Sequence, residues 1–267
     1  MHLAIGTTFD YAVPLETQLA EIERAGFEAV SLGANLGHCD FLQTAVQAEV
    51  RLSVLRHSLE IDSLHVPIAP AYDISKKDPE SRMAAVCRVA LAMAAAVELN
   101  AGIVILHLCY HAPRDYEQDL QSLLDSLDVL IESAENMGIK LAAENLVTEP
   151  SHTFLAESLA TFDSKHYGLC YDSSHAQLTG RQPLEWLERF GDRLLAVHLS
   201  DNDGQQDRHW LPFTGIVDWK ALTNTLRDND FSGSLLLEVE NREGTPTPEF
   251  LRQAADSAMR LREMIEG

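Results

Sequence analysis

Short apolar runs and amphipathic stretches alternate along the whole chain. The apolar runs have the length of β-strands and lie at residues 2–9, 29–34, 61–67, 103–110, 140–146, 167–173, 194–201 and 235–240. The stretches that follow them are typical of helices and lie at residues 15–25, 40–59, 78–99, 115–137, 155–163, 183–190, 218–228 and 247–265. One such pair takes about 33 residues of the 267-residue chain, which is the spacing of a (β/α)8 barrel. We therefore predict an α/β (β/α)8 TIM barrel, with residues 1–267 as a single domain; a doubly wound open sheet is the alternative.

Residues typical of helix caps support several of these boundaries. Asp78 followed by Pro79 predicts a capped helix start with proline at the first helical position. Gly26 and Gly138 stand where the C-terminal caps of two predicted helices belong.

Potential metal ligands stand at or just after the ends of six successive strand candidates. They are His65, His107, Glu144, Asp172, His175, His198, Asp207, His209 and Glu238. In a TIM barrel the active site lies at the C-terminal rim, where the strand ends and the following loops meet. We therefore predict that these residues, although distant in sequence, assemble into one site.

The alternation of side chains along a strand tests this prediction within the sequence. Each candidate ligand shares its parity with small or apolar residues that would fill the barrel interior. These columns are Ile103, Ile105 and His107; Ala142 and Glu144; Gly168, Cys170 and Asp172; and Leu194, Ala196 and His198.

Three carboxylates and one imidazole would converge from the last four strands, namely Glu144, Asp172, Glu238 and His198. Buried carboxylates repel one another and are costly to desolvate, and a divalent cation removes both problems. Oxygen-rich ligation with one histidine suits Mn²⁺, Mg²⁺, Co²⁺ or Zn²⁺. The alternative is that each residue is an ordinary polar strand end with its own hydrogen-bond partner.

Composition narrows the classes of partner. The formal net charge is −21, with 41 acidic and 20 basic residues, and this argues against nucleic acid as a partner. No apolar run approaches the ~20 residues of a membrane span, and the first residues do not read as a signal peptide, so no membrane contact is expected. The four cysteines show no CxxC pairing, which fits a reducing cytoplasm.

Several of these motifs resemble those of the xylose isomerase-like TIM barrels, a family that includes sugar isomerases and epimerases, inosose dehydratases and endonuclease IV. The most specific stretch is VHLSDNDGQQDRHWLPFTGIVDW at residues 197–219. It is similar to the family's H-x-x-D-N, followed by D-x-H, a glycine-containing turn and D-W. The pair Glu144–Asn145 and the Y-D-x-x-H run from Tyr171 to His175 also match.

The resemblance implies roles for the candidate ligands. In epimerase-like members, the residues matching Glu144, Asp172, His198 and Glu238 hold one divalent ion. Those matching Glu144 and Glu238 move the proton at carbon, and His175 would contact a substrate oxygen. In endonuclease IV all nine matching positions bind three zinc ions. His65 and His107 would share one ion with Glu144, and His175, Asp207 and His209 would hold another. The number of ions, one to three, stays open.

Two departures from the family pattern affect the loop after the seventh strand. Thr214 stands where many members have the first glycine of G-x-G, and Arg208 is the only basic residue near the position of a common arginine. Substrate specificity is expected to come from the loops at residues 6–12, 33–40, 67–75 and 204–216.

The leading hypothesis is a metal-dependent isomerase or epimerase of carbohydrate metabolism, acting on a small sugar or keto-polyol through a metal-stabilised enediolate. A lyase of the inosose dehydratase kind would use the same residues. A trinuclear zinc phosphoester hydrolase is the alternative of another class, and a non-catalytic sugar-binding barrel is a third. The sequence leaves open the substrate and whether the chain forms a homo-oligomer.

Overall fold

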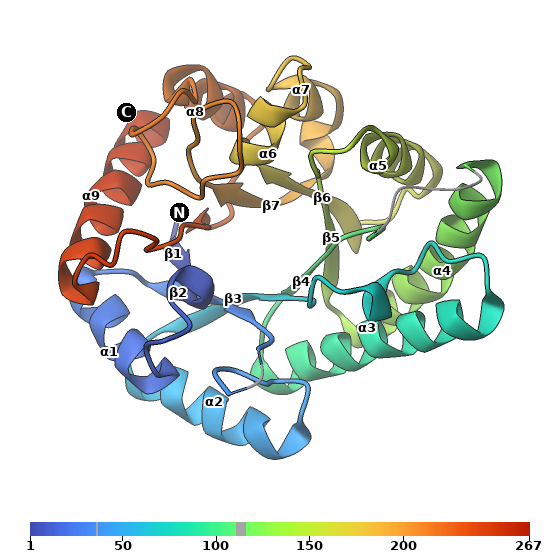
Figure 1. The fold of residues 1–267 in the computed structure, drawn as a ribbon, viewed down its shortest axis with the longest axis horizontal. Coiled ribbons are helices and arrows are strands. Elements are labelled where there is room, and N and C mark those ends of the chain that lie inside the picture. The colour runs from blue at the N-terminus through green and yellow to red at the C-terminus, as the bar shows by residue number, and fades with distance from the viewer. Residues whose placement is uncertain (36, 111–115) are drawn as a thin grey trace.

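The computed structural model describes residues 1–35, 37–110 and 116–267. Eight parallel strands pair in sequence order and close into a barrel, β1 with β8 (Figure 1). The strands are β1 (Leu3–Gly6), β2 (Ala29–Gly33), β3 (Glu60–His65), β4 (Ile103–Leu106), β5 (Lys140–Glu144), β6 (Tyr167–Asp172), β7 (Leu194–Leu199) and β8 (Leu235–Leu237). The predicted TIM barrel is confirmed, and the open-sheet alternative is wrong.

Helices surround the barrel (Figure 1). They are α1 (Leu15–Ala25), α2 (Thr44–Arg56), α3 (Pro79–Leu99), α4 (Tyr116–Met137), α5 (Glu149–Thr161), α6 (Ser173–Leu178), α7 (Glu185–Phe190), α8 (Trp219–Asp228) and α9 (Thr247–Glu266), with short 3-10 turns η1 (Thr7–Phe9), η2 (Pro70–Tyr72) and η3 (Gly191–Arg193). In the described residues, no helix is long and apolar enough to span a membrane.

The predicted helix caps form as expected. Asp78 accepts a hydrogen bond from the backbone N–H of Ser81 at 2.8 Å, and Pro79 begins α3. Gly26 and Gly138 have φ angles of 94° and 72°, which only glycine adopts without strain.

One predicted helix begins earlier than expected, and one observed helix was not predicted. The helix expected at 155–163 begins earlier, at Glu149, where Pro150 occupies the first turn. Helix α6 lies outside the predicted helix ranges, because the sequence there shows only the spacing of Asp172 and His175. Asp172 is in fact its N-cap, and its carboxylate accepts the backbone N–H of His175 at 2.6 Å.

The barrel interior contains the columns predicted from side-chain parity, with one correction. Ile105, Ala142, Cys170 and Ala196 form a buried layer, and Ile103 and Leu195 pack against it. Leu194 was predicted to point inward, but it packs against the outer core. The reason is a register shift in the pairing of β6 with β7, where Leu169 faces Leu194 but Cys170 already faces Ala196.

The strands end earlier than the apolar runs. Strand β4 ends at Leu106 and β8 at Leu237, whereas the runs continue to residues 110 and 240. His107 and Glu238 therefore follow their strands directly, at the rim where catalytic residues of this fold occur.

Candidate metal centre at the barrel mouth

All nine predicted site residues lie at the C-terminal mouth of the barrel. The last residues of β3, β5 and β6 are His65, Glu144 and Asp172; His198 is the penultimate residue of β7; His107 and Glu238 directly follow β4 and β8; His175 lies in α6; and Asp207 and His209 lie in the loop between β7 and α8. Their role as ligands stays a prediction, but the fold brings them together.

Glu144 is surrounded by imidazoles. Its Oε2 lies 3.2 Å from Nε2 of His65 and 3.2 Å from Nε2 of His107. Its Oε1 lies 3.0 Å from Nδ1 of His175. The side chain is only 1% exposed, so its charge is balanced by these rings rather than by water.

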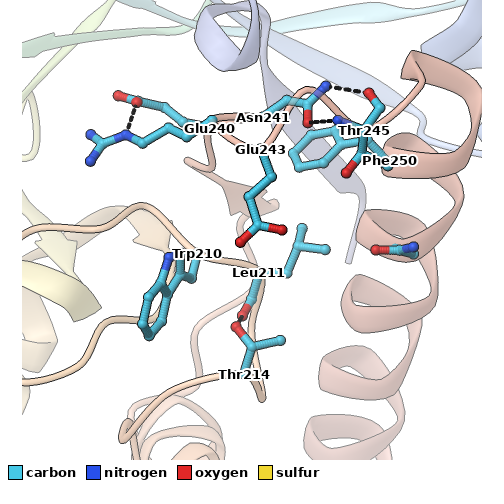
Figure 2. Close-up of a pocket in the computed structure, with 10 residues that line it drawn as sticks. Trp210, Leu211, Thr214, Glu240, Asn241, Glu243, Thr245 and Phe250 are labelled. Carbon is cyan, nitrogen blue, oxygen red and sulfur yellow. Dashed lines mark hydrogen bonds and ion pairs between the residues drawn. The ribbon is translucent and has the colours of Figure 1, made fainter.

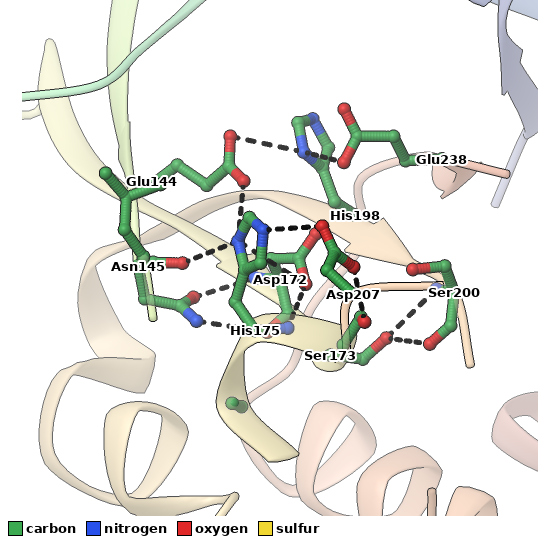
Figure 3. A network of polar contacts seen from close by, with 12 residues as sticks. Glu144, Asn145, Asp172, Ser173, His175, His198, Ser200, Asp207 and Glu238 are labelled. Carbon is green, nitrogen blue, oxygen red and sulfur yellow. Dashed lines mark hydrogen bonds and ion pairs between the residues drawn. The ribbon is translucent and has the colours of Figure 1, made fainter. Parts of the chain in front are cut away.

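Glu144, Asp172, His198 and Glu238 offer ligand atoms that all lie within 4.8 Å of one another (Figure 3). Nδ1 of His198 lies 3.1 Å from Glu238 Oε2, but neither ring nitrogen has a partner with hydrogen-bond geometry. Asp172 Oδ2 is likewise buried without a partner. Buried polar atoms are nearly always paired, so unpaired atoms that converge on one point fit a cation-binding site.

Two further groups share these ligands. One contains His65, His107 and Glu144, and the other His65, His198 and Glu238. Asp207 Oδ2 lies 3.3 Å from His175 Nε2 and 2.9 Å from His209 Nε2. Among the described residues, the ligand atoms of His175, Asp207 and His209 do not all lie within 4.8 Å of one another. A separate ion held by these three residues therefore has weaker geometric support.

The pKa values of Asp172 and Glu238 are shifted in opposite directions. Burial raises the pKa of Asp172 to about 7. The negative charges of Glu144 and Glu238 also raise this pKa, whereas the charge of His175 lowers it. Burial also disfavours the charged form of Glu238, yet the attraction of His198 lowers its pKa to about 2. Without a cation, Asp172 is therefore the carboxyl that most readily holds a proton.

Neighbouring side chains hold the ligands in place (Figure 3). The side-chain amide of Asn145 donates to the carbonyl of Asp172 at 3.0 Å, and its oxygen accepts the backbone N–H of Asp172 at 2.7 Å. The hydroxyl of Ser174 donates to Asp207 at 2.7 Å. Sequence reasoning did not include these two residues in the site, although Asn145 belongs to the E-N motif.

Hydrogen bonds join the D-N motif at Asp201 to the D-W motif at Trp219. Asp201 is fully buried, and its carboxylate accepts the indole N–H of Trp219 at 2.9 Å and the backbone N–H of Val217 at 3.0 Å. Gly215 packs so closely that a Cβ would lie 2.1 Å from the carbonyl of Asn202. The loop thus keeps the glycine it needs sterically, and Thr214 occupies an exposed position.

The side chain of Arg208 forms an ion pair with Asp203. Its guanidinium lies 2.9 Å from the carboxylate of Asp203, and its Cζ lies 5.8 Å from the ring centre of Trp210. These contacts give Arg208 a part in shaping the loop.

Two cavities share Glu240 in their lining. One of about 360 Å³ includes His65, His209 and Glu238, and its lining draws on all four loops predicted to set specificity. The other, of about 310 Å³, lies between Trp210, Glu243 and Phe250 (Figure 2). Only the first touches candidate ligands, so it is the natural place for a substrate.

Comparison with known proteins agrees with this architecture. Residues 19–264 match the family described as xylose isomerase-like TIM barrel. An uncharacterized protein of Sinorhizobium fredii, y4fM, is 31% identical over 64% of this chain, but the match spans only 58% of that relative's length. Fructoselysine 3-epimerase of Escherichia coli O157:H7 is 25% identical over 69% of this chain and 70% of the relative.

Solved structures extend the likeness to the whole fold. The crystal structure of a D-tagatose 3-epimerase-like protein aligns with a TM-score of 0.82 and 23% identity, covering 100% of this chain and 97% of the other. Since the family match covers most of the chain, this protein belongs to the xylose isomerase-like TIM barrel family.

Proposed function

We propose that this protein is a divalent-metal-dependent epimerase or isomerase of a small sugar or keto-polyol. The observation that carries the proposal is the convergence of Glu144, Asp172, His198 and Glu238, with unpaired buried atoms, beside a cavity. Similarity to a fructoselysine 3-epimerase supports the same class of reaction.

The ion would be held by those four side chains. When bound, a divalent ion such as Mn²⁺, Co²⁺, Mg²⁺ or Zn²⁺ would polarise the substrate carbonyl and stabilise negative charge on oxygen. One oxygen of the buried Asp172 accepts no hydrogen bond, and neither ring nitrogen of His198 makes one. The ion-pair partners of His198 are Glu238 and Glu144, which belong to the same four ligands.

Glu238 is the residue we propose as the base. Its side chain is 18% exposed and lines the cavity, whereas that of Glu144 is 1% exposed. The Glu238 carboxylate would accept the proton from the carbon next to the carbonyl, and the electron pair would move to the carbonyl oxygen to give an enediolate. Return of a proton to the other face gives the epimer, and return to the neighbouring carbon gives the isomer.

Glu144 and His175 complete the proposed machinery. Glu144 is the second carboxylate that can carry a proton to the opposite face, and His175 donates a hydrogen bond to a substrate oxygen. Both groups are already linked, because His175 Nδ1 lies 3.0 Å from Glu144 Oε1. A lyase would use the same proton removal, followed by loss of a β-hydroxyl group.

The group formed by His65, His107 and Glu144 is the specific observation that favours a second candidate, a multinuclear zinc phosphoester hydrolase. The net charge of −21 opposes a polyanionic DNA substrate. Binding to abasic-site DNA at low salt separates the two candidates: the epimerase proposal expects none.

The decisive experiment follows exchange of the substrate C–H proton with D₂O by NMR, using metal-reconstituted protein and a panel of ketoses. We expect Glu238→Gln to lose about 10²–10⁴-fold in the exchange rate, the usual contribution of a general base. Glu243→Gln is the matched control, since Glu243 is exposed and lies in the other cavity. Full activity of Glu238→Gln would refute the mechanism.

A further inference from the structure

The exposed apolar side chains of the barrel are concentrated on two neighbouring helices, α2 and α3. These helices contribute Leu52, Leu55, Met83 and Leu91, each between 56% and 61% exposed. They are four of the six large apolar residues that reach 56% exposure in the described part of the chain. Single exposed apolar residues are normal, but a contiguous group of them marks an interaction surface.

These side chains form one surface, which we call the α2–α3 face. An exposed stripe runs along α3, with members four, four and three residues apart: Met83, Cys87, Leu91 and Ala94. On the α2 side, Leu52 and Leu55 line a groove of about 530 Å³ that also includes Glu98 of α3. The groove therefore connects the apolar residues of α2 to the stripe on α3.

The charge of this face differs from that of the rest of the protein. Helices α2 and α3 contain four arginines and three glutamates, whereas the whole chain has 20 basic and 41 acidic residues. Helix α4, which packs on the other side of α3, contains six acidic residues and no basic one. Two chains of net charge −21 repel each other over most of their surface, so the α2–α3 face offers a second copy the least repulsion.

Twofold symmetry makes this arrangement self-complementary. Helix α3 lies between α2 and α4, and neighbouring helices of the barrel run in the same direction (Figure 1). A twofold axis parallel to α3 packs that helix on its copy and places the α2 of each chain against the α4 of the other. The exposed Arg51 and Arg56 of α2 then face a helix that exposes Asp128 and Glu132.

The face is also large enough for a stable pair. Helix α3 has 21 residues and is therefore about 30 Å long. Packed helices lie about 8–10 Å apart, so the three helices present a surface of roughly 30 Å by 20 Å. This approaches the area of about 800 Å² that each partner buries in a standard interface.

We propose that the protein forms a twofold-symmetric homodimer through the α2–α3 face, with α3 packed on the α3 of the second copy and α2 facing its α4. The face lies on the outside of the barrel and contains none of the candidate ligands. The dimer therefore stands or falls independently of the proposed catalytic role.

Sedimentation equilibrium of the full chain tests the proposal. We expect a mass near twice 29.6 kDa for the wild type. Leu91→Glu puts a charge into the face of both copies and should raise the dissociation constant at least about 100-fold. Met259→Glu is the matched control and should stay dimeric, since Met259 is an exposed apolar residue of α9, far from α3 around the barrel (Figure 1). A monomeric wild type, or an equally tight Leu91→Glu dimer, would overturn the proposal.

Crosslinking tests the packing of α3 on its copy without altering the apolar face. Cys87 is exposed, whereas Cys39, Cys109 and Cys170 are buried. Because the twofold axis brings Cys87 close to its copy, a short bismaleimide should link two wild-type chains, and Cys87→Ser should abolish the link. Failure to link the wild-type chains would rule out this packing.

Exchange of charges tests the pairing of α2 with α4. Arg51→Glu should weaken the dimer about tenfold, because an acidic residue then faces an acidic helix in both halves of the interface. Adding Glu132→Lys should restore the affinity, which general damage to the fold would not allow. A double variant as weak as Arg51→Glu alone would contradict the pairing.

Discussion

Asn145 and Asp172 exchange two hydrogen bonds across the ends of β5 and β6, one in each direction, at 3.0 and 2.7 Å. The bonds use the side chain of Asn145 and the backbone of Asp172. They therefore fix the spacing between two adjacent candidate ligands, Glu144 and Asp172, without occupying either carboxylate.

This relationship predicts that Asn145→Ala weakens metal binding about 10–100-fold, as the loss of residues that orient ligands typically does. Competition with a chelating dye measures the affinity. Ser173→Ala is the control, because Ser173 makes a similar reciprocal pair with Ser200, at 2.8 and 3.0 Å, that involves no candidate ligand. Equal losses of affinity in the two variants would remove the orienting role of Asn145.

The loop after β7 depends on the bond between Asp201 and Trp219. Trp219→Phe would leave a buried carboxylate oxygen without its donor, and we expect about 1–3 kcal/mol of lost stability from that cause. Urea unfolding measures the free energy. Trp186→Phe removes a similar indole that stacks on Phe190 at 5.8 Å, and it should cost less. A smaller effect at Trp219 than at Trp186 would show that the bond contributes little.

Metal removal should destabilise the protein. The proposed ion would bind only the folded state, so at a free concentration of 100 times Kd it would contribute about 2.7 kcal/mol of stability, which a chelator would remove. Thermal unfolding with and without Mn²⁺ or Zn²⁺ measures this, together with metal equivalents per chain.

The stoichiometry of variants locates the first ion. Glu144→Gln should abolish its binding, whereas Asp207→Asn should leave one equivalent in place, because Asp207 lies outside the four-ligand group. If Asp207→Asn lost the first equivalent as well, the ligand assignment would be wrong.

His152 should make stability depend on pH below neutrality. Burial lowers the pKa of His152, and this effect is larger than the opposite effect of its hydrogen bond to the carbonyl of Leu146. The charge of Arg181 lowers the pKa further, whereas the charges of Glu149 and Glu185 raise it. Below pH 6.5 the unfolded chain therefore takes up a proton that the folded chain resists, and stability falls by at most about 1.4 kcal/mol per pH unit from this group.

His152→Gln removes that titration. Between pH 7 and pH 5 the wild type should lose more stability than the variant, as followed by urea unfolding at each pH. Parallel curves for the two proteins would mean that His152 keeps its ordinary pKa in the folded state.

The architecture could be read from the sequence because it depends on repeated local patterns. Eight apolar runs at regular spacing predict the barrel, and the parity of Ile105, Ala142, Cys170 and Ala196 predicts its interior layer. The exception is Leu194, since the register shift between β6 and β7 comes from the pairing of two strands and leaves no mark in either one alone.

The positions of the candidate ligands along the chain were likewise visible, because strand ends in a parallel barrel meet at one rim. Only the tertiary structure determined the surroundings of each side chain at that rim. Glu144 is enclosed by imidazoles, Glu238 faces a cavity, and Asp172 keeps one oxygen unpaired. These differences arise from distances between residues far apart in sequence, and no local pattern encodes them.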